Sequence, residues 1–279
     1  MKYLKLNNGV EIPMLGFGVY LVADGDECKN AVSNALESGY RHIDTAALYN
    51  NEASVGQAIK ESGIPREEIF VTTKVWNDSQ RSNEVQAAFD DSINKLGFDY
   101  VDLYLIHWPV KECFVNTWLE LEKIYKSGRA RAIGVSNFKE HQIEDLRKVW
   151  SVVPVLNQVE LHPMLTQKNV INYCKGLDIA VQSWAPLGGR RESCSLKDNL
   201  LDNEVLVNIG KKYGKSAAQV VLRWNIDLGL ITIPKSTTPS RIKENIDIFD
   251  FQLDADDIKA IDALNQNQRV GADPDTFDF

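Results

Sequence analysis

Hydrophobic runs of strand length recur along the chain and alternate with segments of helical spacing. The apolar, β-branched runs occupy residues 16–20, 40–46, 69–75, 101–107, 130–136, 153–160, 179–185 and 230–234. The helical segments occupy residues 27–37, 52–61, 84–96, 115–126, 139–149, 168–174 and 203–226. Within 84–96, Val85, Phe89 and Leu96 keep the three-and-four spacing of one buried helical face, and Gly97 stands where the helix should stop. This alternation predicts an α/β fold with a parallel sheet and right-handed crossovers.

Eight strands alternating with helices is the number that closes a (β/α)8 TIM barrel. No linker rich in Pro, Gly or Ser interrupts the repeats, so we expect residues 1–279 to form a single domain. Residues 3–6 and 10–12 flank an Asn8-Gly9 turn and predict a β-hairpin that closes the barrel floor. Residues 254–264 predict one more capped helix, and residues 271–279 an irregular tail.

Composition and charge exclude several classes of protein. With 44% hydrophobic and 25% charged residues, the chain resembles an ordinary globular protein, and no apolar run reaches the roughly 18 residues of a membrane span. The net charge of −8 argues against nucleic acid as a partner, because phosphate neutralisation needs a basic face. The N-terminus lacks the features of a signal peptide, so we expect a cytoplasmic protein. The four cysteines form no CxxC pair, which predicts reduced thiols and neither a disulfide framework nor a metal site.

Polar residues end three successive strand-like runs. Asp44, Lys74 and His107 close the second, third and fourth runs, and Tyr49 follows the first of these three closely. Parallel strands lie about 4.8 Å apart, so their C-terminal ends would bring the four side chains together, with Lys74 in the middle. A tyrosine with an ordinary pKa near 10 is a poor acid, but an adjacent cation stabilises its anion. Asp44 would hold Lys74 charged and His107 would offer an N–H, which places a proton donor beside a polarised carbonyl.

Each of these residues also has a plainer interpretation. Taken singly, Asp44 could cap a helix, Tyr49 could be a packing residue and His107 could cap the Pro109 turn. Lys74 alone could be the Schiff-base lysine of an aldolase, although Asp44 beside it would favour the charged, non-nucleophilic form. The position of all four at one face of a barrel favours catalysis.

Reduction of a carbonyl also requires a hydride, and the usual carrier is a reduced nicotinamide. A Rossmann fingerprint is missing, because Gly16 and Gly18 are followed by no third glycine in register. Residues 235–241 instead place two cations, Lys235 and Arg241, with several hydroxyls directly after the eighth strand, where a helix begins at Pro239 or Ser240. A ribose phosphate would suit this site, which favours NADPH over NADH. An ordinary capped helix with exposed basic residues is the alternative.

Several strings of the sequence resemble the aldo-keto reductase family, in order and over essentially the whole chain. They are residues 39–46 (GYRHIDTA) with Tyr49, Thr73-Lys74, residues 105–109 (LIHWP), residues 134–138 (GVSNF) and residues 233–236 (IPKS). The chain resembles bacterial-type NADPH-dependent aldehyde and ketone reductases and is similar to the 2,5-diketo-D-gluconate reductase-like members. The resemblance implies a catalytic tetrad of Asp44, Tyr49, Lys74 and His107, with Tyr49 as the general acid.

The same resemblance implies which residues bind NADPH. It assigns the ribose phosphate to Lys235, Ser236, Thr237 and Arg241, and the adenine to Glu244 and Asn245. It places Trp184 against the nicotinamide ring, with Ser136, Asn137 and Gln158 at the carboxamide, Leu187 near the pyrophosphate, and Gly18 and Val19 bordering the cleft. From its pattern alone, Trp184 would more readily be a core tryptophan.

Aromatic residues near three strand ends, Tyr20, Trp76 and Trp108, predict an apolar wall for a small aldehyde or ketone. Many relatives carry Trp in place of Tyr20, so their specificity does not transfer to this chain. The short segment 111–115 and the segment 188–194 are expected to shape the mouth of the site. We therefore expect a monomeric NADPH-dependent carbonyl reductase. A catalytically silent NADPH-binding regulatory protein on the same fold remains the alternative.

Overall fold

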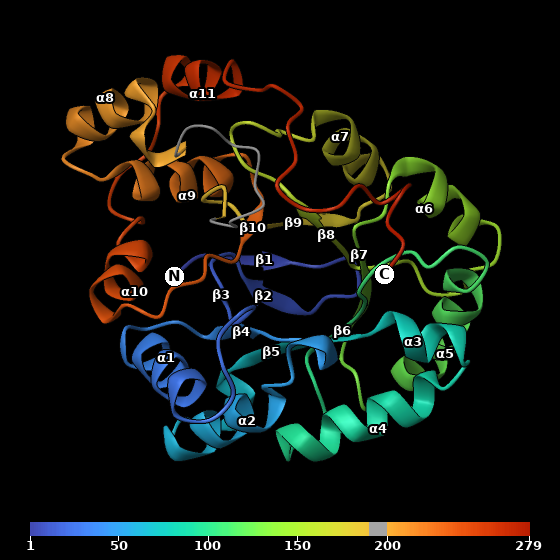
Figure 1. Ribbon diagram of the computed structural model, residues 1–279. Helices are drawn as coiled ribbons and strands as arrows, with labels where there is room; N and C mark the ends of the chain where they lie inside the picture. Colours follow the sequence, from blue (N-terminus) through green and yellow to red (C-terminus); the bar gives the residue numbers. More distant parts are fainter. Residues whose placement is uncertain (190–199) are drawn as a thin grey trace.

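The computed structural model describes residues 1–189 and 200–279, and its centre is a parallel β-barrel (Figure 1). The strands are β3 (Phe17–Gly18), β4 (His42–Asp44), β5 (Phe70–Val75), β6 (Leu103–Ile106), β7 (Ile133–Ser136), β8 (Leu156–Glu160), β9 (Ala180–Trp184) and β10 (Ile231–Thr232). They follow one another in sequence order around the sheet. The two edges then meet, because Gly16 N donates to Thr232 O at 2.9 Å and Thr232 N donates to Met14 O at 2.8 Å. The predicted (β/α)8 barrel is confirmed.

Helices surround the barrel, and most lie where the sequence predicted them. They are α1 (Asp26–Glu37), α2 (Glu52–Glu61), α3 (Asn77–Arg81), α4 (Val85–Leu96), α5 (Phe114–Lys126), α6 (Glu140–Arg147), α7 (Lys168–Gly176), α8 (Glu204–Tyr213), α9 (Ala217–Asp227), α10 (Pro239–Ile246) and α11 (Ala255–Asp262). Short 3-10 turns, η1 (Ala47–Tyr49), η2 (Arg66–Glu68) and η3 (Leu200–Asp202), lie between them. The short helix α3 follows Trp76 and was not predicted from the sequence.

The helical tract predicted over residues 203–226 is two helices. Gly214 ends α8 with φ of 66°, the left-handed conformation that terminates helices. Ser216 then starts α9 with a reciprocal capping box, in which its side chain accepts from Gln219 N and the Gln219 side chain accepts from Ser216 N. A local stop signal followed by a local start signal overrides the continuous apolar periodicity.

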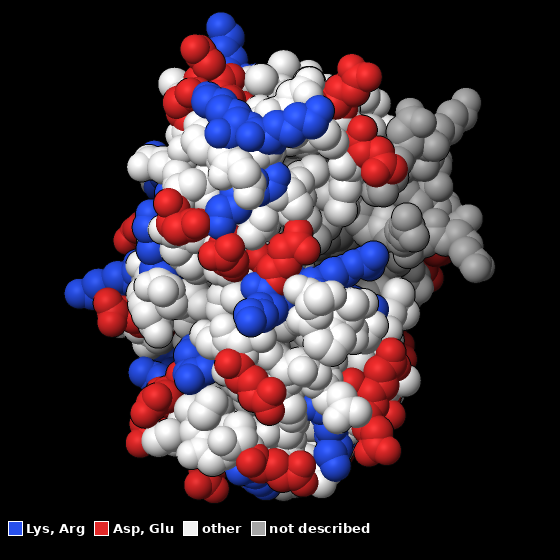
Figure 2. Space-filling view, turned by 90° about the vertical axis from the view of Figure 1, so that its left-hand side faces the viewer, with Lys and Arg blue, Asp and Glu red and all other residues white. Residues whose placement is uncertain are grey.

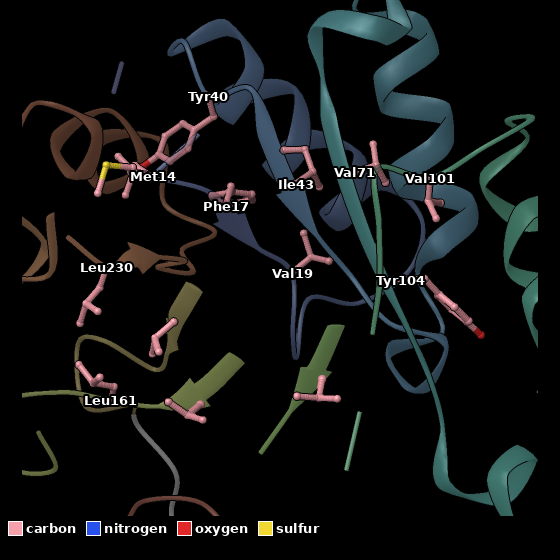
Figure 3. Close-up of a cluster of buried hydrophobic side chains, with 14 of the residues drawn as sticks. Met14, Phe17, Val19, Tyr40, Ile43, Val71, Val101, Tyr104, Leu161 and Leu230 are labelled. Carbon is pink, nitrogen blue, oxygen red and sulfur yellow. The ribbon is translucent and has the colours of Figure 1, made fainter. Parts of the chain in front are cut away.

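The N-terminal hairpin closes the floor of the barrel. Strands β1 (Tyr3–Lys5) and β2 (Glu11–Pro13) pair antiparallel and are drawn across the centre of the barrel in Figure 1. Leu6 and Ile12 pack in one apolar cluster with residues from the N-terminal ends of the barrel strands, including Phe70, Leu103 and Leu156. A second and larger core lies between the sheet and the helices, where Figure 3 draws side chains such as those of Phe17, Ile43 and Val71.

Alternation along each strand determines which side chains face the barrel interior. Phe70 belongs to the floor cluster, so Thr72 and Lys74, two and four residues later, share its face. Leu103 and Leu105 belong to the same cluster and precede His107 by four and two residues, so His107 shares their face. The inner face is thus apolar at the sealed floor and polar at the C-terminal end, where ligands enter barrels of this kind.

Other sequence expectations concern cysteines and the membrane. Cys28, Cys113 and Cys174 are free thiols, whereas Cys194 and most of the expected mouth segment 188–194 lie outside the described residues. Within the two described ranges, no helix combines the length and the apolar character that spanning a bilayer requires. The same ranges contain no group of three or more His, Cys, Asp or Glu side chains that could hold a metal ion.

Candidate active site

A buried ion pair lies at the C-terminal ends of β4 and β5. Asp44 is the last residue of β4, and Lys74 lies near the end of β5. The Lys74 ammonium lies 2.5 Å from Asp44 Oδ1 and also donates to Thr45 O at 2.8 Å. Asp44 is 1% exposed and Lys74 is 0% exposed, so the two charges are screened very little by water.

The second oxygen of Asp44 is also engaged. Gln158, on β8, donates through Nε2 to Asp44 Oδ2 at 2.8 Å and to Gln182 Oε1 at 3.1 Å. The sequence resemblance placed Gln158 at the cofactor carboxamide, but here its amide nitrogen is directed to the carboxylate that pairs with Lys74. Contact between β4 and β8 across the barrel interior has no signal in the sequence, because 114 residues separate the two side chains.

The phenol and the imidazole complete the cluster. Tyr49 ends the turn η1, and the Lys74 ammonium lies 5.0 Å from the centroid of its ring. The ring of His107 lies edge-on to that of Tyr49, with centroids 5.6 Å apart, and the Tyr20 ring lies 4.9 Å from Tyr49 on another side. The structure therefore brings together all four residues that the sequence singled out for catalysis.

Burial shifts the pKa values of His107 and Lys74. Burial, together with the nearby Lys74 ammonium, holds the pKa of His107 well below its usual value, so this imidazole is neutral at pH 7. Burial also lowers the pKa of Lys74, while the attraction and hydrogen bond of Asp44 oppose that shift. A neutral imidazole beside a buried lysine and carboxylate pair suits hydrogen bonding to a carbonyl oxygen.

Residues expected at the nicotinamide end are joined to this cluster by hydrogen bonds. Trp184 ends β9, and its indole N–H donates to Asn137 Oδ1 at 2.8 Å. Asn137 Nδ2 donates in turn to His107 O at 3.0 Å, and Ser136 Oγ donates to Gln158 O at 2.9 Å. Asn137 has φ of 66°, an uncommon conformation for a residue other than glycine and one that clusters at functional sites.

Three other expected cofactor residues have different environments. Gly18 lies where the barrel closes, with its N–H donating to Pro234 O at 3.0 Å. The Val19 side chain is fully buried in the outer core, and its carbonyl accepts from Asn51 Nδ2 at 3.0 Å. The Val19 side chain therefore belongs to the outer core. Leu187 is half-buried against the same core.

The expected phosphate residues gather at the start of α10. Thr238 is its N-cap residue and Pro239 its first helical residue. Lys235, Thr237 and Arg241 are exposed and Ser236 is half-buried; further along, Glu244 is exposed and Asn245 is buried. Within the described part of the chain, neither Lys235 nor Arg241 forms an ion pair, although Lys, Arg, Asp and Glu are interspersed over this face (Figure 2). Two unpaired cations at a helix N-terminus fit a phosphate group.

Aromatic side chains line the other side of His107. The ring centroid of Trp76 lies 5.2 Å from that of His107. Two tail residues that sequence reasoning missed also contact this wall. Phe279 stacks on Trp76 at 5.8 Å between centroids, and Phe277 lies 5.1 Å from Trp108. The only signal in the sequence was a pair of phenylalanines two residues apart in an acidic tail.

Comparisons with known proteins agree with this geometry. Residues 14–266 match the Aldo/keto reductase family. The chain is 52% identical to glyoxal reductase of Bacillus subtilis (strain 168) over 276 residues, which cover 99% of this chain and 97% of that protein. It is 44% identical to methylglyoxal reductase DkgA of Escherichia coli (strain K12) over 278 residues, covering 98% and 97%.

A solved structure extends the agreement to the fold. The crystal structure of MGS-M4, an aldo-keto reductase enzyme from a Medee basin deep-sea metagenome library, superposes with a TM-score of 0.93 at 44% identity and covers 99% of this chain and 100% of that chain. The family match spans most of the chain, and the reductase relatives match over nearly their full lengths. The chain therefore belongs to the aldo-keto reductase family of oxidoreductases, whose general reaction is carbonyl reduction.

Proposed function

We propose that this protein uses NADPH to reduce aldehydes or ketones to alcohols, with Tyr49 as the general acid. The observation that carries the proposal is the position of the Lys74 ammonium, 5.0 Å from the Tyr49 ring and 2.5 Å from Asp44. A cation at this distance in a buried site favours the phenolate that remains after proton donation. The reverse reaction, alcohol oxidation, would proceed when alcohol and NADP are abundant.

Each residue of the tetrad has a separate task in this proposal. Asp44 balances and orients the Lys74 ammonium, and Lys74 makes Tyr49 a better acid. His107, neutral at pH 7, donates a hydrogen bond to the carbonyl oxygen of the substrate and orients it towards Tyr49. Tyr49 then gives its proton to that oxygen as negative charge develops there.

The cofactor residues are proposed on the fit of their chemistry. When bound, the reduced nicotinamide would supply the hydride. Trp184, Ser136, Asn137 and Gln158 would hold the nicotinamide end next to the tetrad, because hydrogen bonds already link them to His107 and Asp44. Lys235 and Arg241 form no ion pair with the residues that the structure describes, and these two charges support a ribose phosphate at the start of α10, and therefore NADPH over NADH.

The substrate is proposed to be a small carbonyl compound held between the tetrad and the wall formed by Tyr20, Trp76 and Trp108. Relatives named for glyoxal and methylglyoxal reduction support small dicarbonyl compounds as the first substrates to assay. We expect the protein to act as a monomer in the cytoplasm.

The deciding experiment measures NADPH consumption and alcohol formation by the purified protein with glyoxal, methylglyoxal and aromatic aldehydes. Turnover that depends on both NADPH and the carbonyl compound is expected. NADPH binding without turnover of any carbonyl would instead indicate the silent binding protein. Borohydride trapping of a substrate on Lys74 would indicate the aldolase, which the engagement of its ammonium by Asp44 and Thr45 O argues against.

A further inference from the structure

A fully buried carboxylate outside the tetrad holds the C-terminal tail. Glu160 is the last residue of β8, on the same face as Gln158 two residues earlier, and is 0% exposed. Its Oε1 accepts from Val270 N and contacts His162 Nε2 at 3.1 Å, and its Oε2 accepts from Gly271 N at 3.1 Å. We call this arrangement the tail clasp: the Glu160 carboxylate, His162 and the N–H groups of Val270 and Gly271. None of these groups has a task in the proposed chemistry.

The tail clasp lies directly beside the proposed nicotinamide site. Glu160 and Trp184 are register partners on β8 and β9. Gly271 passes so close that a Cβ atom there would lie 2.4 Å from Trp184 Cη2 and 3.1 Å from Glu160 Oε2. Only glycine fits between these two side chains, so the clasp holds the tail main chain against the edge of the Trp184 indole.

Beyond the clasp, the tail continues to the aromatic wall. In Figure 1 the C-terminal segment runs from α11 past α7 towards α6. Lys139 holds it there through Asp273 and Asp275, each at 2.6 Å. Phe277 and Phe279 then lie against the tryptophan side chains of the wall, Trp108 and Trp76, and Asn77 Nδ2 donates to Phe279 O at 3.0 Å.

We propose that Glu160 is a positioning residue for substrate selection, which acts through the tail by holding Phe277 and Phe279 against Trp108 and Trp76. This inference rests on the proposed reductase function, because the wall it completes lies beside His107. A carboxylate suits the task chemically, since its two oxygens accept from both main-chain N–H groups and contact the histidine. A carboxamide of the same shape offers one acceptor oxygen and turns a donor towards another donor.

The test compares Glu160→Gln with the unchanged protein. We expect faster amide hydrogen exchange at Val270 and Gly271, which does not depend on activity. With an aromatic aldehyde, KM should rise about three- to tenfold, the size of one or two lost aromatic contacts. With methylglyoxal, kcat should stay within about twofold, because the tetrad is untouched. Glu37→Gln, an exposed carboxylate at the end of α1, is the matched control and should change neither quantity.

A double-mutant cycle shows whether Glu160 acts through the tail. In a background that carries Phe277→Ala and Phe279→Ala, Glu160→Gln should add no further rise in KM for the aromatic aldehyde. An equal rise in that background would overturn the inference, since Glu160 would then act by another route. Unchanged hydrogen exchange, or an unchanged KM in the presence of faster exchange, would overturn it as well.

Two further measurements distinguish a failure of this inference from a folding defect and from a failure of the proposed function. If Glu160→Gln does not fold, Lys139→Gln removes the two ion pairs further along the same tail and should change exchange and KM in the same direction. If the unchanged protein reduces no carbonyl, the proposed function fails. The inference would then be tested by hydrogen exchange and by the calorimetric affinity for the aromatic aldehyde. It is rejected if the variants alter neither of these two quantities.

Discussion

The ammonium of Lys74 lies 5.0 Å from the centre of the Tyr49 ring. The same ammonium is bound on its other sides by Asp44 Oδ1 and by Thr45 O, so it has little freedom to move away. Because this ion pair is buried, its field on the neighbouring phenol is screened less than it would be in water. The arrangement places the ammonium that closes one of the three polar strand ends beside the phenol that is the proposed acid.

Tyr49→Phe should remove most of the carbonyl reduction while leaving NADPH binding unchanged. The phenol hydroxyl is the proposed proton donor, and general acid catalysis contributes about a hundredfold or more. Turnover and the NADPH dissociation constant would be measured side by side. Tyr3→Phe, at an exposed position on the hairpin, serves as the control. Turnover of Tyr49→Phe within a few-fold of the unchanged protein would remove Tyr49 as the acid.

The double substitution Lys235→Ala and Arg241→Ala should raise the NADPH dissociation constant at least about tenfold, because each charge-assisted hydrogen bond to phosphate contributes about 1.5–3 kcal/mol. The NADH dissociation constant should change much less. Fluorescence titration with both cofactors checks this, with Lys243→Ala on the exposed part of the same helix as control. An equal loss of affinity for both cofactors would contradict the phosphate assignment.

His42 should make the protein less stable in mild acid. This side chain is fully buried, and burial lowers its pKa to about 4, against about 6.5 in the unfolded chain. Between these two pKa values the unfolded state binds more protons than the folded state. The stability contributed by the neutral, buried His42 is therefore complete above pH 6.5 and is lost as the pH falls towards 4. The loss from this one group is about 3 kcal/mol.

Urea unfolding at pH 7, 6 and 5 measures this effect. In His42→Gln the part of the pH dependence of the unfolding free energy that comes from this residue should disappear. His107, whose pKa is also lowered, will still contribute to that dependence. A variant whose unfolding free energy depends on pH as steeply as that of the unchanged protein would show that His42 does not titrate in this range.

Gly56→Ala should destabilise the protein by about 1–3 kcal/mol or more, the typical cost of overpacking a core. Gly56 lies in α2, and a Cβ atom there would come within 2.0 Å of Leu96 O, at the end of α4. Gly176→Ala, at the end of α7, is the matched control and should be nearly neutral, because among the described residues outside its own turn no atom comes within 4 Å of the added Cβ. Thermal unfolding of the two variants makes the comparison; equal melting temperatures would contradict the close approach of α2 and α4.

Some of the site could be predicted because its signals are local. Asp44, Lys74 and His107 each end an apolar run, and the strand period of two places Lys74 on the same face as Phe70 and Thr72. Apolar periodicity alone was misleading where a helix stop signal and a helix start signal interrupt it. Residues 203–226 look like one helix until the left-handed Gly214 and the capping box at Ser216 are taken into account.

The sequence by itself determined the alternating strands and helices, the count of eight and the three polar strand ends, because each depends on neighbouring residues and on a fixed backbone period. Only the tertiary structure decided the contact of Gln158 with Asp44, the tail clasp at Glu160 and the stacking of Phe279 on Trp76. These pairs lie far apart in the chain and have no shared periodicity. They meet only because the barrel closes and the tail crosses its open end.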